Sequence, residues 1–215
     1  MVERVLLIRY SEIHLKGLNR PFFERKLSDA IKAAVRGFGG SVTREQGRMY
    51  VWGVAEKDEI SAISKLQKVF GIHSVSPALV TEKEWENIIN VSADLLCITA
   101  KKTGFDTFKV FAKRSDKRFP MTSDTICREL GHELLNRCDT VHVDIHAPKI
   151  KISVEIREKA FIYTEEYACT GGMPSGSAGL ATLLISGGID SPVAGYMMAK
   201  RGLHLSAVHF YSYPY

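Results

Sequence analysis

The stretch that decides the fold spans residues 181–191 and reads ATLLISGGIDS. Its apolar first half predicts a buried strand, and its second half predicts a tight turn that leads into a helix. Gly187 and Gly188 allow the turn and let an anion approach the backbone. Because backbone N–H groups point outward at a helix N-terminus, this strand, turn and helix predict a phosphate site.

The residues that follow extend this unit to a second strand. Ser191 is a suitable N-cap and Pro192 suits the first helical position, where a missing N–H costs nothing. The helix is expected to stop at Gly202, and residues 203–210 form a second apolar strand. The turn lacks the Gly-Lys-Ser/Thr ending of a Walker A loop and the GxGxxG spacing of a dinucleotide site, which excludes both.

The run from Ser186 to Ala194, SGGIDSPVA, resembles the PP-loop of ATP pyrophosphatases. The resemblance implies an enzyme that cleaves ATP between its α and β phosphates, holds the released pyrophosphate in this loop and forms an adenylate. The alternative is an ordinary glycine-rich turn between a strand and a helix, which a bare Ser-Gly-Gly would favour.

Composition is typical of a globular protein of one to three small domains, with 215 residues, 45% hydrophobic and 25% charged. No apolar run reaches the roughly 18 residues that span a bilayer, and no signal segment opens the chain. We therefore expect a cytoplasmic protein without a membrane partner. The net charge of +5 favours an anionic partner.

The four cysteines lack the CxxC or CxxH spacing of zinc sites. Their scatter argues against a zinc site and against a disulfide framework. Cys97 and Cys127 lie among apolar residues of expected helices and should be buried. Cys169 precedes a glycine-rich stretch and is expected to be a structural or incidental thiol rather than a reactive one.

Residues 1–81 predict a ferredoxin-like domain. Strands are expected at 5–8, 41–45, 48–52 and 72–81, with helices at 21–35 and 57–70 and a polar loop from Ser11 to Asn19. The order β-α-β-β-α-β is that of the ferredoxin-like unit.

Residues 82–168 predict a separate α/β module. Helices are expected at 85–101 and 123–137, the second capped by Thr122 or Ser123, and strands at 105–113, 149–157 and 161–167, with a short extended segment at 141–144. Residues 169–179 are glycine-rich and predict a linker or mobile loop. The fold class is therefore α/β, with an α+β N-terminal part and the start of a doubly wound parallel domain at 180–215.

A basic run between two aromatic residues lies in the middle module. Phe111 and Phe119 enclose a segment whose cations could neutralise phosphates, while exposed rings could stack on unpaired bases. The alternative is a solvated loop with both rings in the core. The predicted RNA-binding residues are Lys113, Arg114, Lys117, Arg118 and Phe119.

Two further stretches carry a family resemblance. Residues 9–20, RYSEIHLKGLNR, resemble the opening motif of the ThiI family of tRNA 4-thiouridine synthetases. A second segment is similar to a THUMP domain, an RNA-binding module, and its matching residues are Phe108, Arg118-Phe119-Pro120, Thr122-Ser123, Glu129-Leu130-Gly131, Val143-Asp144 and Pro148. The order of ferredoxin-like domain, THUMP and PP-loop is the ThiI arrangement, and it covers essentially the whole chain.

The resemblance implies a defined reaction. With Mg²⁺ and ATP, the PP-loop domain would transfer AMP to the C4 oxygen of uridine 8 in tRNA, and a persulfide sulfur would then replace that oxygen to give 4-thiouridine. The implied partners are the acceptor stem and 3′ end of tRNA, a cysteine desulfurase or other persulfide donor, and a second copy in a homodimer. A link to sulfur supply for the thiazole of thiamine is also implied.

The same resemblance assigns site residues. Asp190 is the expected catalytic carboxylate, acting through Mg²⁺ because a bare carboxylate would repel phosphate. Residues at the carboxyl ends of both strands should border the adenosine. For Leu184 and Ile185 the alternative is a core strand, and for His209 it is a packed, satisfied histidine. The expected ATP and pyrophosphate site comprises Leu184, Ile185, Ser186, Gly187, Gly188, Asp190, Ser191, His209 and Phe210.

One departure from the family pattern leaves an alternative function open. A doubly wound PP-loop domain needs about five strands, and only two fit between Leu180 and Tyr215. Later nucleotide contacts and the family's sulfur-carrying cysteine are not found in the sequence, so the 215 residues alone are expected to be inactive. The alternative is a non-catalytic tRNA-binding module. Another PP-loop enzyme, such as a 2-thiolating or amidating ligase, is disfavoured by residues 9–20 and the THUMP-like segment.

Overall fold

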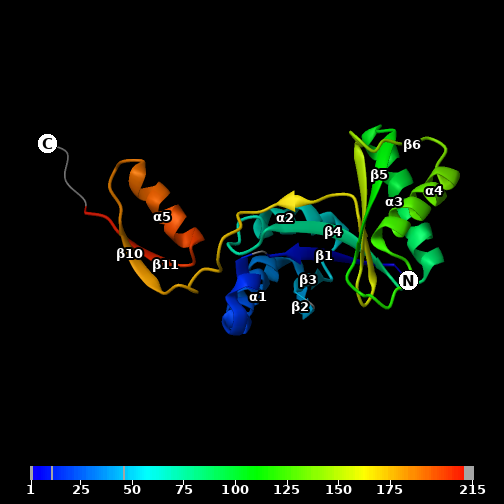
Figure 1. The fold of residues 1–215 in the computed structure, drawn as a ribbon. Coiled ribbons are helices and arrows are strands. Elements are labelled where there is room, and N and C mark those ends of the chain that lie inside the picture. Colours follow the sequence, from blue (N-terminus) through cyan, green and yellow to red (C-terminus); the bar gives the residue numbers. More distant parts are fainter. Residues whose placement is uncertain (1, 11, 46, 211–215) are drawn as a thin grey trace. The chain divides into compact units, whose positions relative to one another are not determined.

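The computed structural model describes residues 2–10, 12–45 and 47–210 (Figure 1). The chain divides into two compact units. The N-terminal unit contains residues 6–75 and 167–215, and the middle unit contains residues 1–5 and 76–166. A mixed sheet has the strand order β2 (Ser41–Glu45), β3 (Arg48–Trp52), β1 (Glu3–Arg9), β4 (Ser74–Thr81), β8 (Ala160–Tyr163), β7 (Ile150–Ile156), β5 (Thr107–Arg114) and β6 (His142–Val143), with β9 (Tyr167–Ala168) paired to β4. None of the described helices combines the length and apolar composition that crossing a membrane requires.

The N-terminal unit has the predicted ferredoxin-like order. Its elements are β1 (Glu3–Arg9), α1 (Arg20–Val35), β2 (Ser41–Glu45), β3 (Arg48–Trp52), α2 (Glu59–Leu66) and β4 (Ser74–Thr81), with short 3-10 helices at Glu12–Asn19, Arg36–Phe38 and Glu56–Asp58. The apolar faces of both helices meet the sheet in one core that includes Ile8, Leu27, Ile31 and Ile63. The predicted hairpin agrees residue for residue, because β2 and β3 pair antiparallel from Ser41 with Trp52 to Glu45 with Arg48.

Two N-terminal expectations were wrong in detail. The segment expected to be a polar loop forms 3-10 turns from Glu12 to Asn19, interrupted at Gly17, whose φ of 50° breaks the helical path. The second helix is shorter than predicted because the chain tightens after Leu66 into i→i−3 hydrogen bonds, such as that from the Val69 N–H to the Leu66 carbonyl. These turns lead to Gly71, whose φ of 101° suits glycine.

The middle unit packs two helices on one face of its strands. Its elements are α3 (Trp85–Thr103), β5 (Thr107–Arg114), α4 (Ser123–Arg137), β6 (His142–Val143), β7 (Ile150–Ile156) and β8 (Ala160–Tyr163). β5 runs parallel to β6 and β7, whereas β7 and β8 are antiparallel. The core contains Leu96, Phe108, Ile126, Leu130 and Ile152, which are all fully buried. The predicted cap is confirmed, since Thr122 Oγ1 accepts a hydrogen bond from the Thr125 N–H at 3.2 Å.

The prediction of one strand over residues 161–167 was wrong. The structure forms β8, which ends at Tyr163, and a separate β9 (Tyr167–Ala168) in the N-terminal unit. Both strands pair with β4, at Leu79–Thr81 and at Ser74–Val75 respectively. The intervening residues belong to neither strand, so the hydrogen-bonded ladder along β4 is interrupted.

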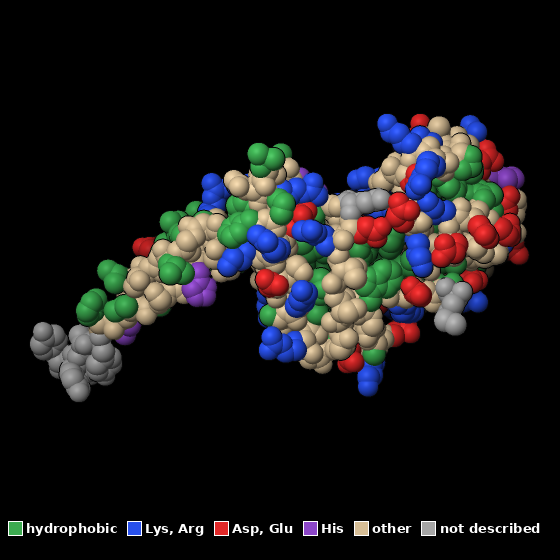
Figure 2. Space-filling view, turned by 90° about the horizontal axis from the view of Figure 1, so that it is seen from below, with side chains coloured by type: hydrophobic (Ala, Val, Ile, Leu, Met, Phe, Trp, Pro, Cys, Tyr) green, Lys and Arg blue, Asp and Glu red, His purple; other side chains and the backbone are tan. Residues whose placement is uncertain are grey.

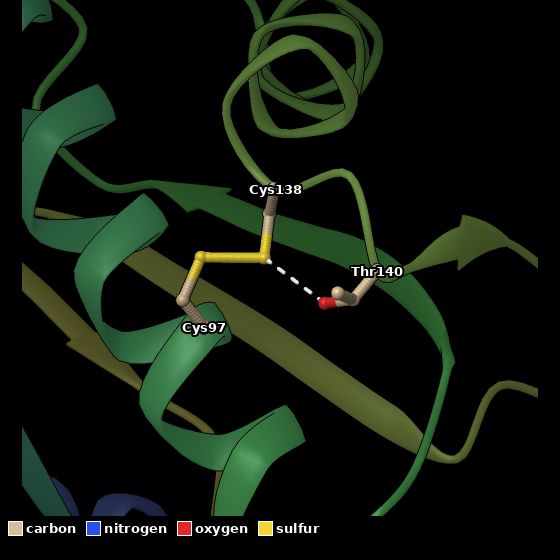
Figure 3. Close-up of a disulfide and its surroundings, with 3 residues drawn as sticks. All are labelled: Cys97, Cys138 and Thr140. Carbon is tan, nitrogen blue, oxygen red and sulfur yellow. Dashed lines mark hydrogen bonds between the residues drawn. A yellow bond between two sulfur atoms is a disulfide. The ribbon is translucent and has the colours of Figure 1, made fainter.

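The cysteines also depart from expectation. Cys97 on α3 and Cys138 at the end of α4 form a disulfide, with a Cα–Cα distance of 6.2 Å (Figure 3). The two residues are 41 positions apart, and spacing alone gave no sign of the pair. Cys169 is half-buried in the N-terminal core, and burial raises the pKa of its thiol to about 11. A thiol of this kind is protonated at neutral pH, as a structural role requires.

The C-terminal segment forms the predicted strand, helix and strand. Its elements are β10 (Leu180–Leu184), α5 (Asp190–Lys200) and β11 (His204–Val208), and β10 and β11 pair parallel from Leu180 with His204 to Leu184 with Val208. The glycine-rich segment before it is packed rather than a free linker. Met173 is buried in the N-terminal core, and its N–H donates to the Lys200 carbonyl at 2.9 Å.

Candidate nucleotide and RNA sites

The turn between β10 and α5 is shaped by two serines. The Ser186 N–H donates to Ser191 Oγ at 3.1 Å, and the two hydroxyl groups lie 3.2 Å apart. The Gly188 N–H lies 3.4 Å from Ser186 Oγ. Gly187 has open space where a Cβ would stand. The turn therefore forms an exposed, hydroxyl-lined loop with clear access to its backbone, as a phosphate site requires.

The helix begins earlier than the sequence predicted. Asp190 is its first residue and Ile189 its N-cap, so the expectation of Ser191 as N-cap was wrong. The Ser191 hydroxyl instead closes the turn through Ser186. Pro192 lies in the first turn, where its missing N–H leaves no intrahelical bond unmade. Asp190 therefore stands at the positive end of α5, beside the turn.

The predicted adenosine residues lie at the carboxyl ends of both strands. His209 Nδ1 lies 2.9 Å from the Ile185 carbonyl oxygen, and this contact joins the ends of β10 and β11. Leu184 and Phe210 are 64% and 79% exposed, so neither is a core residue within this chain. Leu184 therefore does not occupy the buried strand position of its alternative. His209 has a backbone partner but is exposed, so it is not the packed histidine that its alternative expected.

Carboxylates are sparse around this turn. Among residues 2–10, 12–45 and 47–210, no three His, Cys, Asp or Glu side chains gather as a metal site would need. Asp190 is exposed beside the turn as a single carboxylate. This donor set fits Mg²⁺ that arrives with a nucleotide, since Mg²⁺ is commonly held by one or two carboxylates together with substrate phosphates.

The basic run of the middle unit is only partly available to a ligand. Asp116 receives the Lys83 ammonium at 2.6 Å and Arg118 Nε at 3.0 Å, and these hydrogen bonds hold the pKa of its carboxyl well below the usual range. Arg118 also lies 3.4 Å from Glu158. Arg114 Nη1 donates to the Phe119 carbonyl at 3.1 Å. Both arginines thus order the loop, which weakens their expected role as phosphate ligands.

The two lysines of the run differ from its arginines. Lys113 and Lys117 are exposed, and no ion pair to either is found in the described part of the chain. They remain available to phosphate. Of the four cations that the sequence predicted to bind phosphate, Arg118 is paired with carboxylates, Arg114 donates to backbone carbonyls, and the two lysines have no ion pair within the described residues.

The two aromatic residues of the run differ in exposure, and the exposed one is Phe111 rather than Phe119. Phe119 is only 7% exposed and packs in the core of the middle unit, so its expected stacking on a base was wrong. Phe111 is 41% exposed, with Lys109 Nζ 5.3 Å from its ring centroid. Sequence alternation could have placed Phe111 on the exposed face, since Phe108 and Val110 are buried positions of β5 and Phe111 lies on the opposite face.

Models of known protein families match three successive segments of the chain. The family model of the ThiI ferredoxin-like domain matches residues 5–76, that of the THUMP domain residues 81–165, and that described as thiamine biosynthesis protein (ThiI) residues 176–215. The chain belongs to the ThiI family. Its three matched segments stand in the ThiI order, as residues 9–20, the THUMP-like segment and the PP-loop predicted.

Curated ThiI relatives are named probable tRNA sulfurtransferases. The protein of Acetivibrio thermocellus is 47% identical over the whole chain, which covers 55% of that relative. The protein of Caldanaerobacter subterraneus subsp. tengcongensis is 46% identical over 98% of the chain and 54% of the relative. The chain therefore spans about half the length of the curated relatives it matches.

Two solved structures share the fold of this ThiI chain. A 4-thiouridine synthetase in complex with RNA and bound ATP is 37% identical, with a TM-score of 0.84 over 99% of the chain and 54% of that structure. PH1313 from Pyrococcus horikoshii is 31% identical, with a TM-score of 0.86 over 96% of the chain and 68% of that structure.

Proposed function

We propose that this chain is part of an ATP-dependent tRNA uracil 4-sulfurtransferase. The observation that carries the proposal is the exposed turn at Ser186–Ser191, which stands between a parallel strand and a helix N-terminus. The ThiI resemblance, the names of the curated relatives and the solved 4-thiouridine synthetase support it.

The proposed chemistry has two steps. The C4 oxygen of uridine 8 attacks the α phosphorus of ATP, the bond to the bridging oxygen breaks, and pyrophosphate leaves. In the second step the terminal persulfide sulfur attacks C4 and AMP departs with the former uracil oxygen. A thiol then attacks the carrier sulfur, so that the S–S bond breaks, a disulfide forms on the carrier and the terminal sulfur stays on C4. Mg²⁺ would neutralise phosphate charge during the first step. The persulfide comes from a cysteine desulfurase or another donor of terminal sulfur.

Residues of the turn have separate tasks in the first step. The backbone at Gly187 and Gly188 approaches the pyrophosphate, and the positive end of α5 favours its negative charge. The hydrogen bonds between Ser186 and Ser191 close the turn and fix its shape. Asp190 holds the Mg²⁺ that accompanies ATP, and the strand ends at Ile185 and His209 border the adenosine.

Exchange of radioactive pyrophosphate into ATP tests the first step. The assay uses a protein of the relatives' length that carries this chain, with tRNA present. Asp190→Asn should abolish exchange and leave tRNA affinity unchanged, because the substitution keeps the side-chain size and removes one charge. Asp29→Asn, which removes an exposed carboxylate from α1, is the matched control and should exchange like the parent.

The same assay distinguishes the proposed enzyme from the alternative, a non-catalytic module. A non-catalytic tRNA-binding module would bind tRNA and show no exchange in the parent protein. Equal exchange in the parent and in Asp190→Asn would remove Asp190 from the proposed site.

A further inference from the structure

The family motif at residues 9–20 surrounds a buried carboxylate. Glu24, on α1, is 6% exposed and accepts three hydrogen bonds. The Tyr10 hydroxyl lies 2.5 Å from Oε1, Arg20 Nε lies 2.7 Å from the same oxygen, and Arg44 Nη1 lies 2.9 Å from Oε2. Tyr10, directly after β1, and one residue each from α1 and β2 are thus hydrogen-bonded to one side chain.

The surroundings of Glu24 favour the charged form of its carboxyl group. Burial raises the pKa of its carboxyl, but hydrogen bonds from Tyr10 and Arg20 and the charges of Arg20 and Arg44 more than offset this, so the pKa lies below its ordinary value. One carboxylate therefore faces two guanidinium groups, which leaves an excess positive charge. A structural ion pair needs only one of them.

Both guanidinium groups remain open to solvent. The side chains of Arg20 and Arg44 are 36% and 46% exposed, whereas Glu24 is nearly enclosed. Each guanidinium has five N–H donors, of which a single N–H is bonded to Glu24. Figure 2 shows Lys and Arg side chains gathered on the part of the molecule that holds α1.

A histidine lies against the same cluster. The His14 ring stacks on Tyr10, with centroids 4.6 Å apart. A Cβ at Gly47 would stand 2.9 Å from His14 Cε1 and 3.1 Å from Arg20 Nη2, so glycine leaves room for both side chains. Burial lowers the pKa of His14, and the charges of Arg20 and Arg48 lower it further. The site is therefore electropositive.

We infer that Arg20 and Arg44, oriented by Glu24, form a binding site for a backbone phosphate of RNA in the N-terminal unit. The inference deepens the proposed function and rests on it, because tRNA supplies the phosphate. Planar guanidinium groups suit phosphate oxygens, and a fixed pair loses less side-chain freedom on binding than two mobile lysines. Glu24 is a positioning residue that acts through the two arginines.

The test is the salt dependence of tRNA binding to the 215-residue chain. Fluorescence anisotropy with an unmodified tRNA transcript gives the slope of log affinity against log salt concentration. Arg44→Gln should weaken binding several-fold and reduce the slope by about 0.7 to 0.9, the value of one lost phosphate contact. Tyr10 and Arg20 still hold Glu24 in this variant, so the unit should fold.

Arg25→Gln is the matched control. Arg25 is exposed on α1 and lies outside the cluster, so its loss removes the same charge from the same unit. Its slope should stay near that of the parent. Arg44→Lys should recover most of the slope but less of the affinity, because it keeps the charge and loses the planar fork.

The NMR titration of His14 separates binding from a purely structural role. His14 faces Tyr10, Glu24, Arg20 and Arg48. Bound RNA should raise the pKa of His14 in the parent because a phosphate adds negative charge, and the rise should be smaller in Arg44→Gln. An unchanged His14 pKa in the parent on RNA binding would overturn the inference.

The outcomes distinguish the inference from the proposed function. If the parent does not bind tRNA, the inference fails, whereas the proposed function is decided by pyrophosphate exchange in the protein of the relatives' length. If the parent binds and Lys113→Ala with Lys117→Ala flattens the slope, while Arg44→Gln behaves like Arg25→Gln, only the inference of this phosphate site is overturned.

Discussion

The Tyr10 hydroxyl links the stability of the N-terminal unit to pH. Burial, and then its hydrogen bond to Glu24, raise the pKa of Tyr10 to about 12 from an ordinary 10.0. Between these values the unfolded chain loses the proton and the folded chain keeps it. The free energy of unfolding should therefore be intact below pH 10 and fall as pH rises toward 12.

Tyr10→Phe tests this link. At neutral pH the variant should lose about 1.5–3 kcal/mol, the range for a hydrogen bond to a charged group. Its alkaline loss of stability should also be shallower than that of the parent. Urea unfolding followed by Trp52 fluorescence, in a Trp85→Phe background, reports on the N-terminal unit. Tyr196→Phe removes an exposed hydroxyl and should match the parent, and an equally steep loss in Tyr10→Phe would refute the link.

Alanine substitution should affect stability at one phenylalanine of the basic run and RNA affinity at the other. Phe119→Ala should destabilise the middle unit by about 3–5 kcal/mol, because it empties a core position. Phe111→Ala should leave stability nearly unchanged and lower affinity for RNA with an unpaired 3′ tail by about 1–3 kcal/mol, if its ring stacks on one base. Unfolding followed by Trp85 fluorescence measures the change in stability, and fluorescence anisotropy measures the change in RNA affinity. An equal loss of affinity for tailed and tailless RNA in Phe111→Ala, or no loss for the tailed RNA, would argue against stacking.

At the scale of elements, the end of β5 and the loop that follows it should bind phosphate through Lys113 and Lys117. Lys113→Ala with Lys117→Ala should reduce the salt slope of tRNA binding by about 1.4 to 1.8, twice the value of one contact. Arg118→Ala should reduce it less, since its charge is already matched by Asp116 and Glu158. A larger effect for Arg118 than for the two lysines would contradict the assignment.

Local sequence predicted most elements and missed what distant residues impose. The hairpin at Ser41–Trp52 and the cap at Thr122 follow from alternation and hydrogen-bonding side chains a few residues apart. The pair of Lys83 with Asp116 joins residues 33 apart, and no pattern within the loop reveals it. The same holds for the disulfide of Cys97 with Cys138.

The candidate sites divide in the same way. The turn at Ser186–Ser191 could be predicted because its chemistry lies in consecutive residues. The Glu24 cluster could not, since its hydrogen-bond donors come from the residue after β1, from α1 and from β2, and only the fold brings them together. Which cations face solvent also depends on tertiary pairing rather than on their spacing.

At the scale of the whole molecule, residues 1–215 should bind ATP weakly. β10 and β11 form a sheet of two strands, and Leu184 at its carboxyl end is 64% exposed, so little apolar surface is available to enclose adenosine. Isothermal calorimetry should give a dissociation constant well above the micromolar range. Micromolar binding would show that the described turn and strand ends suffice for the nucleotide site.

Formation of 4-thiouridine tests the central claim most directly. A protein of the relatives' length that carries this chain is incubated with ATP, Mg²⁺, a persulfide donor and unmodified tRNA, and the nucleosides are analysed by mass spectrometry. We expect 4-thiouridine in the parent, none without ATP or in Asp190→Asn, and none when uridine 8 is replaced by cytidine. Thiolation without ATP, or no thiolation by a parent that binds both tRNA and ATP, would contradict the claim.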